Sequence, residues 1–422
     1  MNSMKVRSLT ATINRTKGQI TLGQLPLPAR LANLLSSLAL TMLLFPLGAS
    51  GATPITAASD RPLARGDWSQ FRFGPQHHGF NPFETILSPS TVRGLEEQWS
   101  TPTGQAIASS PAVVNGVLYV ASLDVEGKVY ALDIATGDIL WAAPPAVTGG
   151  FQASPAVKNG VVYVTSLYGA VYALDAATGN TVWTGGDQFG QIVASPVVAG
   201  GVVYVGYNSG LLQALDAATG AALWTAEAGA SIYSSPAVAG GRVFVASNNG
   251  KVRAFDAASG NELWAADTSL IMWSSPAVAG GIVFVGSRDD HKLYAFDAAT
   301  GATLWTATTG DWVQSSPAVA DGVVFIGSND SRLYAFDGAS GTVRWTTRLG
   351  GIVFSAPAVA NGVVYVGASD GNLYALRAAD GRRLWNALVG EEIISCPTVS
   401  NGVVYVGTYD SEGKIVAFGL AQ

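Results

Sequence analysis

The chain has 422 residues, a formal net charge of −6, an apolar content of 48% and only 12% charged side chains. When the five basic residues of positions 1–52 are set aside, the net charge of −6 becomes −11 for the rest. An acidic body argues against a nucleic-acid partner, because contact with phosphates needs clustered Lys and Arg.

The first 52 residues have the order of a secretory signal. Basic residues precede the apolar run Leu31–Leu47, and small residues follow at positions 48–52. The run contains Asn33 and Pro46 and is short for a membrane span of about 20 residues. We predict a cleaved signal peptide, with an uncleaved N-terminal anchor as the alternative and the only expected membrane contact. The protein is thus expected outside the cytoplasm: extracellular, periplasmic or at the cell surface. It is not expected to be a lipoprotein, because no cysteine stands directly after the run.

Residues 53–94 form a leader or linker rich in proline, glycine and aromatic residues. Positions 67–73 read Asp-Trp-Ser-Gln-Phe-Arg-Phe. This stretch lacks the pattern that dominates the rest of the chain, so we place it outside the repeated domain.

A sequence repeat of about forty residues, here called the phrase, then occurs eight times. It opens with Ser-Pro-Ala-Val, continues through an apolar run and ends in Ala-Leu-Asp-x-x-Thr-Gly-x-x-x-Trp. The copies are 40 to 44 residues apart, and their opening prolines are Pro111, Pro155, Pro196, Pro236, Pro276, Pro317, Pro357 and Pro397. A repeat this regular indicates a repeat architecture in place of separate cores.

Each copy predicts four short antiparallel strands, because runs rich in Val, Tyr and Phe alternate with glycine turns. In the fifth copy these are 275–278, 282–286, 292–297 and 302–305. Four strands per repeat, arranged radially, make a propeller blade. We therefore predict an all-β, eight-bladed β-propeller over residues 95–422, and a monomer.

The tryptophans that end the copies predict how the ring closes. The eighth copy ends at Phe418 without a tryptophan, whereas Trp99 lies 12 residues before Pro111, the gap found between most copies. The N-terminal strand is therefore expected to complete the last blade. We assign a structural role, packing on Ala and Gly of a neighbouring blade, to Trp99, Trp141, Trp183, Trp224, Trp264, Trp305, Trp345 and Trp385.

The phrase Tyr-Ala-Leu-Asp-x-x-Thr-Gly-x-x-x-Trp, at 172–183, resembles the repeat of the pyrroloquinoline-quinone-like (PQQ-like) propeller family. The resemblance covers about residues 95–418. It implies either a non-enzymatic assembly-factor propeller or the propeller of a quinoprotein alcohol dehydrogenase. For the enzymes it implies a quinone over a tryptophan, a Ca²⁺ bound by Glu and Asn or Asp, a catalytic Asp and often a disulfide between adjacent cysteines. This chain has one cysteine, Cys396, which stands where most copies have serine, so it forms no such disulfide.

Comparison of the copies with one another predicts which face carries specificity. The turns after strands one and three barely vary, whereas the turns after strand two and the links between blades vary strongly. On the variable face, aromatic and amide side chains near the channel predict a mouth for a flat ligand or a peptide. They are Gln152, Tyr233, Trp273, Trp312, Gln314 and Phe354, with ordinary packing as the alternative.

A second set on the same face is acidic. Ring closure makes the first and last blades neighbours, and brings six carboxylates into one sector: Asp124, Glu126, Glu391, Glu392, Asp410 and Glu412. Hard cations such as Ca²⁺ and basic partner patches both bind carboxylates. A solvated rim, partly neutralised by Lys128 and Lys414, is the alternative.

The stretch 288–291 (Arg-Asp-Asp-His) is interpreted as a polar exposed loop, because the other histidines, His77 and His78, lie in the leader and give no zinc set. No motif for a catalytic triad or phosphate loop is present. The sequence therefore favours a non-catalytic binding or scaffolding module for a protein, peptide or cell-envelope ligand, with no cofactor expected. The alternative is a dehydrogenase that uses PQQ and Ca²⁺ to oxidise an alcohol or sugar.

Overall fold

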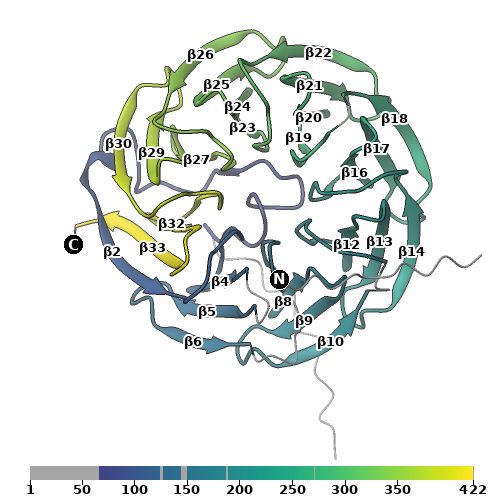
Figure 1. Ribbon diagram of the computed structural model, residues 1–422, viewed down its shortest axis with the longest axis horizontal. Helices are drawn as coiled ribbons and strands as arrows, with labels where there is room; N and C mark the ends of the chain where they lie inside the picture. The colour runs from purple at the N-terminus through teal and green to yellow at the C-terminus, as the bar shows by residue number, and fades with distance from the viewer. Residues whose placement is uncertain (1–65, 124–126, 144–149, 187–188, 270, 422) are drawn as a thin grey trace, which may run out of the picture. The chain divides into compact units, whose positions relative to one another are not determined.

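Each repeat folds into a four-stranded antiparallel sheet because its apolar runs are short, rich in β-branched residues and ended by glycine turns. The computed structural model describes residues 66–123, 127–143, 150–186, 189–269 and 271–421. The chain separates into two units, Met1–Pro54 and Ile55–Gln422, and every described residue belongs to the second. In that unit eight sheets surround a central axis, which confirms the predicted eight-bladed β-propeller (Figure 1).

The strands of each blade follow in order from the inner to the outer strand. Blade one has β3 (Ala112–Val114), β4 (Val117–Ala121), β5 (Val129–Asp133) and β6 (Ile139–Ala142). Blade two has β7 (Ala156–Lys158), β8 (Val161–Thr165), β9 (Val171–Asp175) and β10 (Thr181–Gly185). Blade three has β11 (Val197–Ala199), β12 (Val202–Gly206), β13 (Leu211–Asp216) and β14 (Ala222–Glu227). Blade four has β15 (Ala237–Ala239), β16 (Arg242–Ser247), β17 (Lys251–Asp256) and β18 (Glu262–Asp267).

Blade five has β19 (Ala277–Ala279), β20 (Ile282–Ser287), β21 (Lys292–Asp297) and β22 (Thr303–Thr308). Blade six has β23 (Ala318–Ala320), β24 (Val323–Ser328), β25 (Arg332–Asp337) and β26 (Val343–Arg348). Blade seven has β27 (Ala358–Ala360), β28 (Val363–Gly367), β29 (Asn372–Arg377) and β30 (Arg383–Leu388), with the short β1 (Phe80–Asn81) parallel to β27. Blade eight has β31 (Thr398–Ser400), β32 (Val403–Gly407), β33 (Lys414–Leu420) and, from the other end of the repeated region, β2 (Leu95–Pro102).

The ring is closed by the pairing of β2 with β33. The two strands are antiparallel over their whole length, from Leu95 opposite Leu420 to Pro102 opposite Lys414. The N-terminal strand therefore completes the last blade, as the position of Trp99 predicts. Among the described residues the only helical segment is the 3-10 turn η1 (Val92–Gly94) before β2, and no helix has the length and apolar character needed to cross a membrane.

The constant turn between strands three and four is held by its aspartate. In blade two, Asp175 Oδ1 accepts hydrogen bonds from the backbone N–H of Ala177 (3.1 Å) and Thr178 (2.9 Å) and from the Thr178 hydroxyl (2.8 Å). Gly179 then takes a positive φ of 73°, which glycine adopts without strain. In the first six copies, Asp, Thr or Ser, and Gly therefore recur for a local structural reason.

The tryptophans of seven outer strands dock on that turn in the next blade. The Trp183 indole N–H donates to Ala217 O at 3.0 Å, and its ring lies so close to Gly220 that an added Cβ would be 2.6 Å from it. All eight tryptophans assigned a structural role donate in the same way, at 2.9–3.1 Å. The last, Trp385, donates to Leu95 O at the start of β2. Apolar cores fill the space between adjacent blades.

Residues 67–81, here called the channel segment, run through the middle of the ring (Figure 1). Inner strands are edge strands whose N–H groups need partners. Five inner-strand valines donate to backbone carbonyls of the channel segment at 2.7–2.9 Å: Val157, Val238, Val278, Val319 and Val359. Val113 exchanges two bonds of 2.8 Å with Trp68. Side chains of the channel segment bond to the other two blades. The Gln70 side chain accepts from the Val198 N–H of blade three (3.0 Å), and the Asn81 side chain donates to Val399 O of blade eight (2.9 Å). Part of the stretch assigned to the leader thus contacts every blade.

Two basic side chains of the channel segment are buried. The Arg72 guanidinium donates to the carbonyls of His77 (3.2 Å) and Pro317, and burial lowers its pKa to about 10, so it stays charged at neutral pH. Burial, with a smaller contribution from the Arg72 charge, lowers the pKa of His77 to about 3. His77 is therefore neutral in the folded protein at neutral pH.

The contact between tryptophan and glycine predicts a measurable packing penalty. Gly260 has φ of +74°, and an added Cβ would lie 2.6 Å from the Trp224 ring. Gly241 has φ of +72° and nothing within 4 Å. Gly241→Ala should lower the free energy of unfolding by about 1–2 kcal/mol from backbone strain alone. Gly260→Ala should lower it by roughly a further 1–3 kcal/mol from overpacking. Urea unfolding measures both, and equal losses would contradict the packing role.

Burial of neutral His77 predicts acid sensitivity. Its pKa falls from 6.5 to about 3 on folding, so below pH 6.5 the unfolded chain binds a proton that the folded chain rejects. The free energy of unfolding should drop as pH falls from 6.5 to 5, with His77 contributing a slope that approaches about 1.4 kcal/mol per pH unit. His77→Gln should remove that contribution, whereas His291→Gln, in a surface turn, should not. An unchanged slope in His77→Gln would refute this assignment.

Candidate functional site

The mouth of the central channel on the variable face holds a cavity of about 440 Å³, here called the mouth cavity. Its wall is formed by the residues three positions before the blade-opening prolines: Ala108, Gln152, Val193, Tyr233, Trp273, Gln314, Phe354 and Ile394. The links between blades position these side chains, since each link ends where an inner strand begins. The structure thus brings together five of the six residues predicted to line a ligand mouth.

A second ring lies two residues closer to the inner strands. It consists of Ser110, Ser154, Ser195, Ser235, Ser275, Ser316, Ala356 and Cys396, all of which line the mouth cavity. The backbone N–H of one blade donates to the hydroxyl of the next, at 2.8 Å from Ser110 to Ser154 and 3.0 Å from Ser154 to Ser195. Cys396 takes part, as its Sγ accepts from the Ala356 N–H at 3.4 Å and its N–H donates to Ser110 Oγ at 3.0 Å. Alanine interrupts this serine ring at position 356.

Phe71 of the channel segment also lines the mouth cavity and packs edge-on against His77, with ring centroids 5.2 Å apart. In the wall, the Tyr233 and Trp273 rings meet edge to face at 6.3 Å. The Gln314 side-chain oxygen accepts a hydrogen bond from Asn329 Nδ2 at 3.1 Å. The mouth cavity therefore has aromatic side chains on one side and amide groups on others, and Phe71 of the channel segment also lines it.

The described lining of the mouth cavity combines aromatic, amide and hydroxyl groups. None of the described lining residues is a histidine, an aspartate or a glutamate. The six serine hydroxyls of the lining and the Cys396 thiol all accept hydrogen bonds from backbone N–H groups. General acid–base and nucleophilic catalysis need a titratable base within hydrogen-bond reach of the reacting group. The described lining supplies aromatic surface and hydrogen-bonding groups, which are the groups that orient a bound ligand.

Trp312, the sixth predicted mouth residue, does not line the mouth cavity. It lies over the guanidinium of Arg288, whose Cζ is 3.9 Å from the Trp312 ring centroid and 5.2 Å from that of Trp273. In the sequence Arg288 belongs to a stretch predicted to be a polar exposed loop, and its contact with the two tryptophans was not predicted. The available signal was that the fifth copy alone combines a wall tryptophan with an arginine directly after strand two.

The acidic sector is only partly assembled in the described residues. Glu391, Asp410 and Glu412 share a cavity of about 400 Å³ with Lys414, whose Nζ is 3.6 Å from Glu412. Glu392 does not line this cavity, and partial burial raises the pKa of its carboxyl. Asp124 and Glu126 lie outside the described residues. Within the described ranges no three acidic, histidine or cysteine side chains are grouped to hold a metal ion, so Ca²⁺ binding stays a prediction.

The fold and the mouth cavity define a PQQ-like β-propeller with a ligand-sized opening. The chain belongs to the family whose sequence model is described as outer membrane protein assembly factor BamB. Four overlapping matches, 91–191, 168–290, 248–389 and 289–421, together span more than three quarters of the chain.

Individual relatives fall into two groups. A crystal structure of BamB from Moraxella catarrhalis is similar at 20% identity and a TM-score of 0.65, over 77% of this chain and 97% of that one. The quinohemoprotein alcohol dehydrogenase of Comamonas testosteroni is similar at 17% identity and a TM-score of 0.73, over 85% of this chain and 81% of that one. At these identities the likeness shows the fold alone. Lupanine 17-hydroxylase [cytochrome c] of Pseudomonas sp is 31% identical over 101 residues, which are 24% of this chain and 14% of that protein.

The lining does not fit a calcium-bound quinone. Ca²⁺ takes six to eight oxygen ligands, and carboxylates are usually among them. The described lining residues include no carboxylate. Trp273 offers an exposed ring, but it stands in the wall, edge to face with Tyr233. The single cysteine, Cys396, is held in the serine ring.

Proposed function

We propose that this protein is an exported, non-catalytic propeller that binds a protein or peptide of the cell envelope in its mouth cavity. The observation that carries the proposal is the lining: aromatic and amide side chains surround a ligand-sized opening, and the described lining residues include no histidine and no carboxylate. Pockets that take drug-sized ligands have volumes of roughly 300–1,000 Å³ and a mostly apolar lining with a few polar groups. Membership of the assembly-factor family supports a protein partner.

Export rests on the order of charge and hydropathy in residues 1–52 and on the family's description as an outer-membrane assembly factor. The scaffold itself also favours binding. The copies share their scaffold and differ in the links that form the wall of the mouth cavity. Rigid scaffolds with variable loops are typical of recognition modules.

Loss of the aromatic wall should abolish capture of the partner. Protein lacking residues 1–52 is immobilised, exposed to solubilised native envelope, and the retained protein is identified by mass spectrometry. The variant Tyr233→Ala/Trp273→Ala/Phe354→Ala should lose that partner, because aromatic anchors supply most of the binding energy at such sites. Leu263→Ala, an exposed apolar truncation on the outer strand β18, is the matched control and should retain it. Retention by the triple variant would move the site away from the mouth cavity.

A PQQ-dependent dehydrogenase is the second candidate, favoured by the similarity to quinohemoprotein alcohol dehydrogenase and to lupanine 17-hydroxylase. The lack of carboxylates in the described lining predicts that added PQQ and Ca²⁺ form no complex with the purified protein. Visible absorbance and dye-linked oxidation of alcohols and sugars measure this. A stoichiometric complex with turnover would establish the enzyme and overturn the binding-module proposal.

A further inference from the structure

Arg288 lies at the rim of the mouth cavity in a fixed position. It follows β20 directly, and its backbone N–H donates to Ile271 O at 3.2 Å, which ties the turn to the link that carries Trp273. Its guanidinium contacts the rings of Trp273 and Trp312, which are 45% and 38% exposed. Trp273 lines the mouth cavity, so the guanidinium lies beside the opening. Stacking on aromatic rings is a favourable arrangement for arginine and leaves its N–H groups free to bind.

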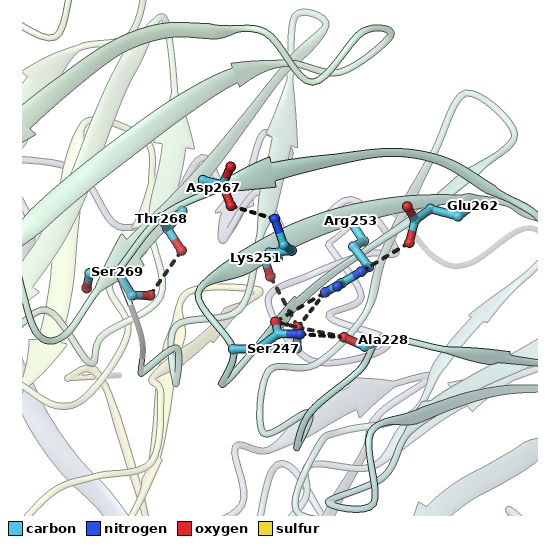
Figure 2. A network of polar contacts seen from close by, with 9 residues as sticks. Ala228, Ser247, Lys251, Arg253, Glu262, Asp267, Thr268 and Ser269 are labelled. Atoms are coloured by element: carbon cyan, nitrogen blue, oxygen red, sulfur yellow. Dashed lines mark hydrogen bonds and ion pairs between the residues drawn. The ribbon is translucent and has the colours of Figure 1, made fainter.

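The hydrogen-bonding capacity of this guanidinium is unused. Its Nε is buried without a partner, and no carboxylate in the described part of the chain lies within 4.0 Å of it. Asp311 Oδ1 instead accepts from the Trp312 N–H at 2.8 Å. Arg253 of blade four is the contrast (Figure 2): its Nε donates to Glu262 at 3.1 Å and its Nη1 to Ser247 Oγ at 2.9 Å. Arg253 is a paired structural arginine, whereas Arg288 is positioned but unpaired.

The lining of the mouth cavity favours a particular charge and shape for a ligand that binds beside Arg288. None of its described lining residues is a carboxylate, and the charged Arg72 lies directly after Phe71 in the channel segment. An ammonium group therefore finds no counter-charge there, whereas an anion does. The channel segment crosses the ring beneath the cavity, so a polypeptide cannot thread through it. A chain can fill a cavity of this kind only with a side chain or with its end.

We infer that Arg288 binds the C-terminal carboxylate of a peptide whose last side chain, large and apolar, enters the mouth cavity between Tyr233, Trp273 and Phe354. The inference rests on the proposed binding function and names the ligand chemistry of the same site. Arginine binds a carboxylate through two parallel N–H···O bonds, which are stronger than neutral hydrogen bonds. Trp273 connects the two parts of this site, because it lines the mouth cavity and its ring also contacts Arg288.

The test uses the full chain and an array of decapeptides ending in Phe, Tyr or Leu. Each sequence is made twice, once with a free C-terminal carboxylate and once with a C-terminal amide, and affinities of the bound sequences are measured by calorimetry. The amide should bind at least about tenfold more weakly than the acid, from the loss of a charge-assisted contact. Arg288→Gln should weaken the acid by a similar factor and leave the amide unchanged. Arg348→Gln, an exposed arginine on β26, is the matched control and should bind as the unmodified protein does.

The outcomes separate the two proposals. Equal binding of acid and amide, with loss in Tyr233→Ala/Trp273→Ala/Phe354→Ala, overturns the role of Arg288 and keeps the mouth cavity as a peptide site. Binding that follows an internal Asp or Glu, regardless of the terminus, overturns the assignment to a chain end. If Arg288→Gln weakens acid and amide alike, the arginine acts only by holding the tryptophans. If no peptide of the array binds, the inference fails, and the envelope capture experiment decides separately whether the binding function stands.

Discussion

The structure depends on one contact made around the ring: the indole of each outer strand docks on the next blade. Its N–H donates to a carbonyl of that blade, and in the repeated turns the ring lies against a glycine that has no room for a side chain. A blade on its own has two edges and two apolar faces, so it is stable only between neighbours. The contact is also circular, because Trp385 reaches Leu95 of β2 and Trp99 reaches Ile134 of blade one.

A ring joined at its outer rim still leaves eight inner strands whose edges face the channel. The channel segment gives these inner strands hydrogen-bond partners in all eight blades. Its backbone groups bond to six blades, and the side chains of Gln70 and Asn81 bond to the other two. The same segment gives the mouth cavity Phe71 and brings the charge of Arg72 beneath it. The mouth cavity is therefore built from both the ring and the channel segment.

The proposed binding function and the unpaired Arg288 are both related to the difference between constant and variable positions. Where the copies agree, the side chains are occupied by turns and blade contacts, as Asp175 and Trp183 are. Where they disagree, side chains such as Trp273 and Arg288 face the opening and keep exposed surface or unused hydrogen-bonding groups. The relatives of both kinds share the scaffold, so the proposed recognition depends on the residues at which the copies of this chain differ.

By itself the sequence determined the repeat, the number of blades and the closing strand, because these follow from local turn chemistry and from the spacing of Trp99. It also determined which residues form the wall of the mouth cavity. Because the eight copies have the same register, the residue three positions before each blade-opening proline lies at the same level of the ring. Only the tertiary structure decided the path of the channel segment, because residues 67–81 have no repeat and their partners are spread over eight blades. It likewise decided the place of Trp312, outside the cavity and over Arg288, because that contact joins the links of two blades that no local pattern relates.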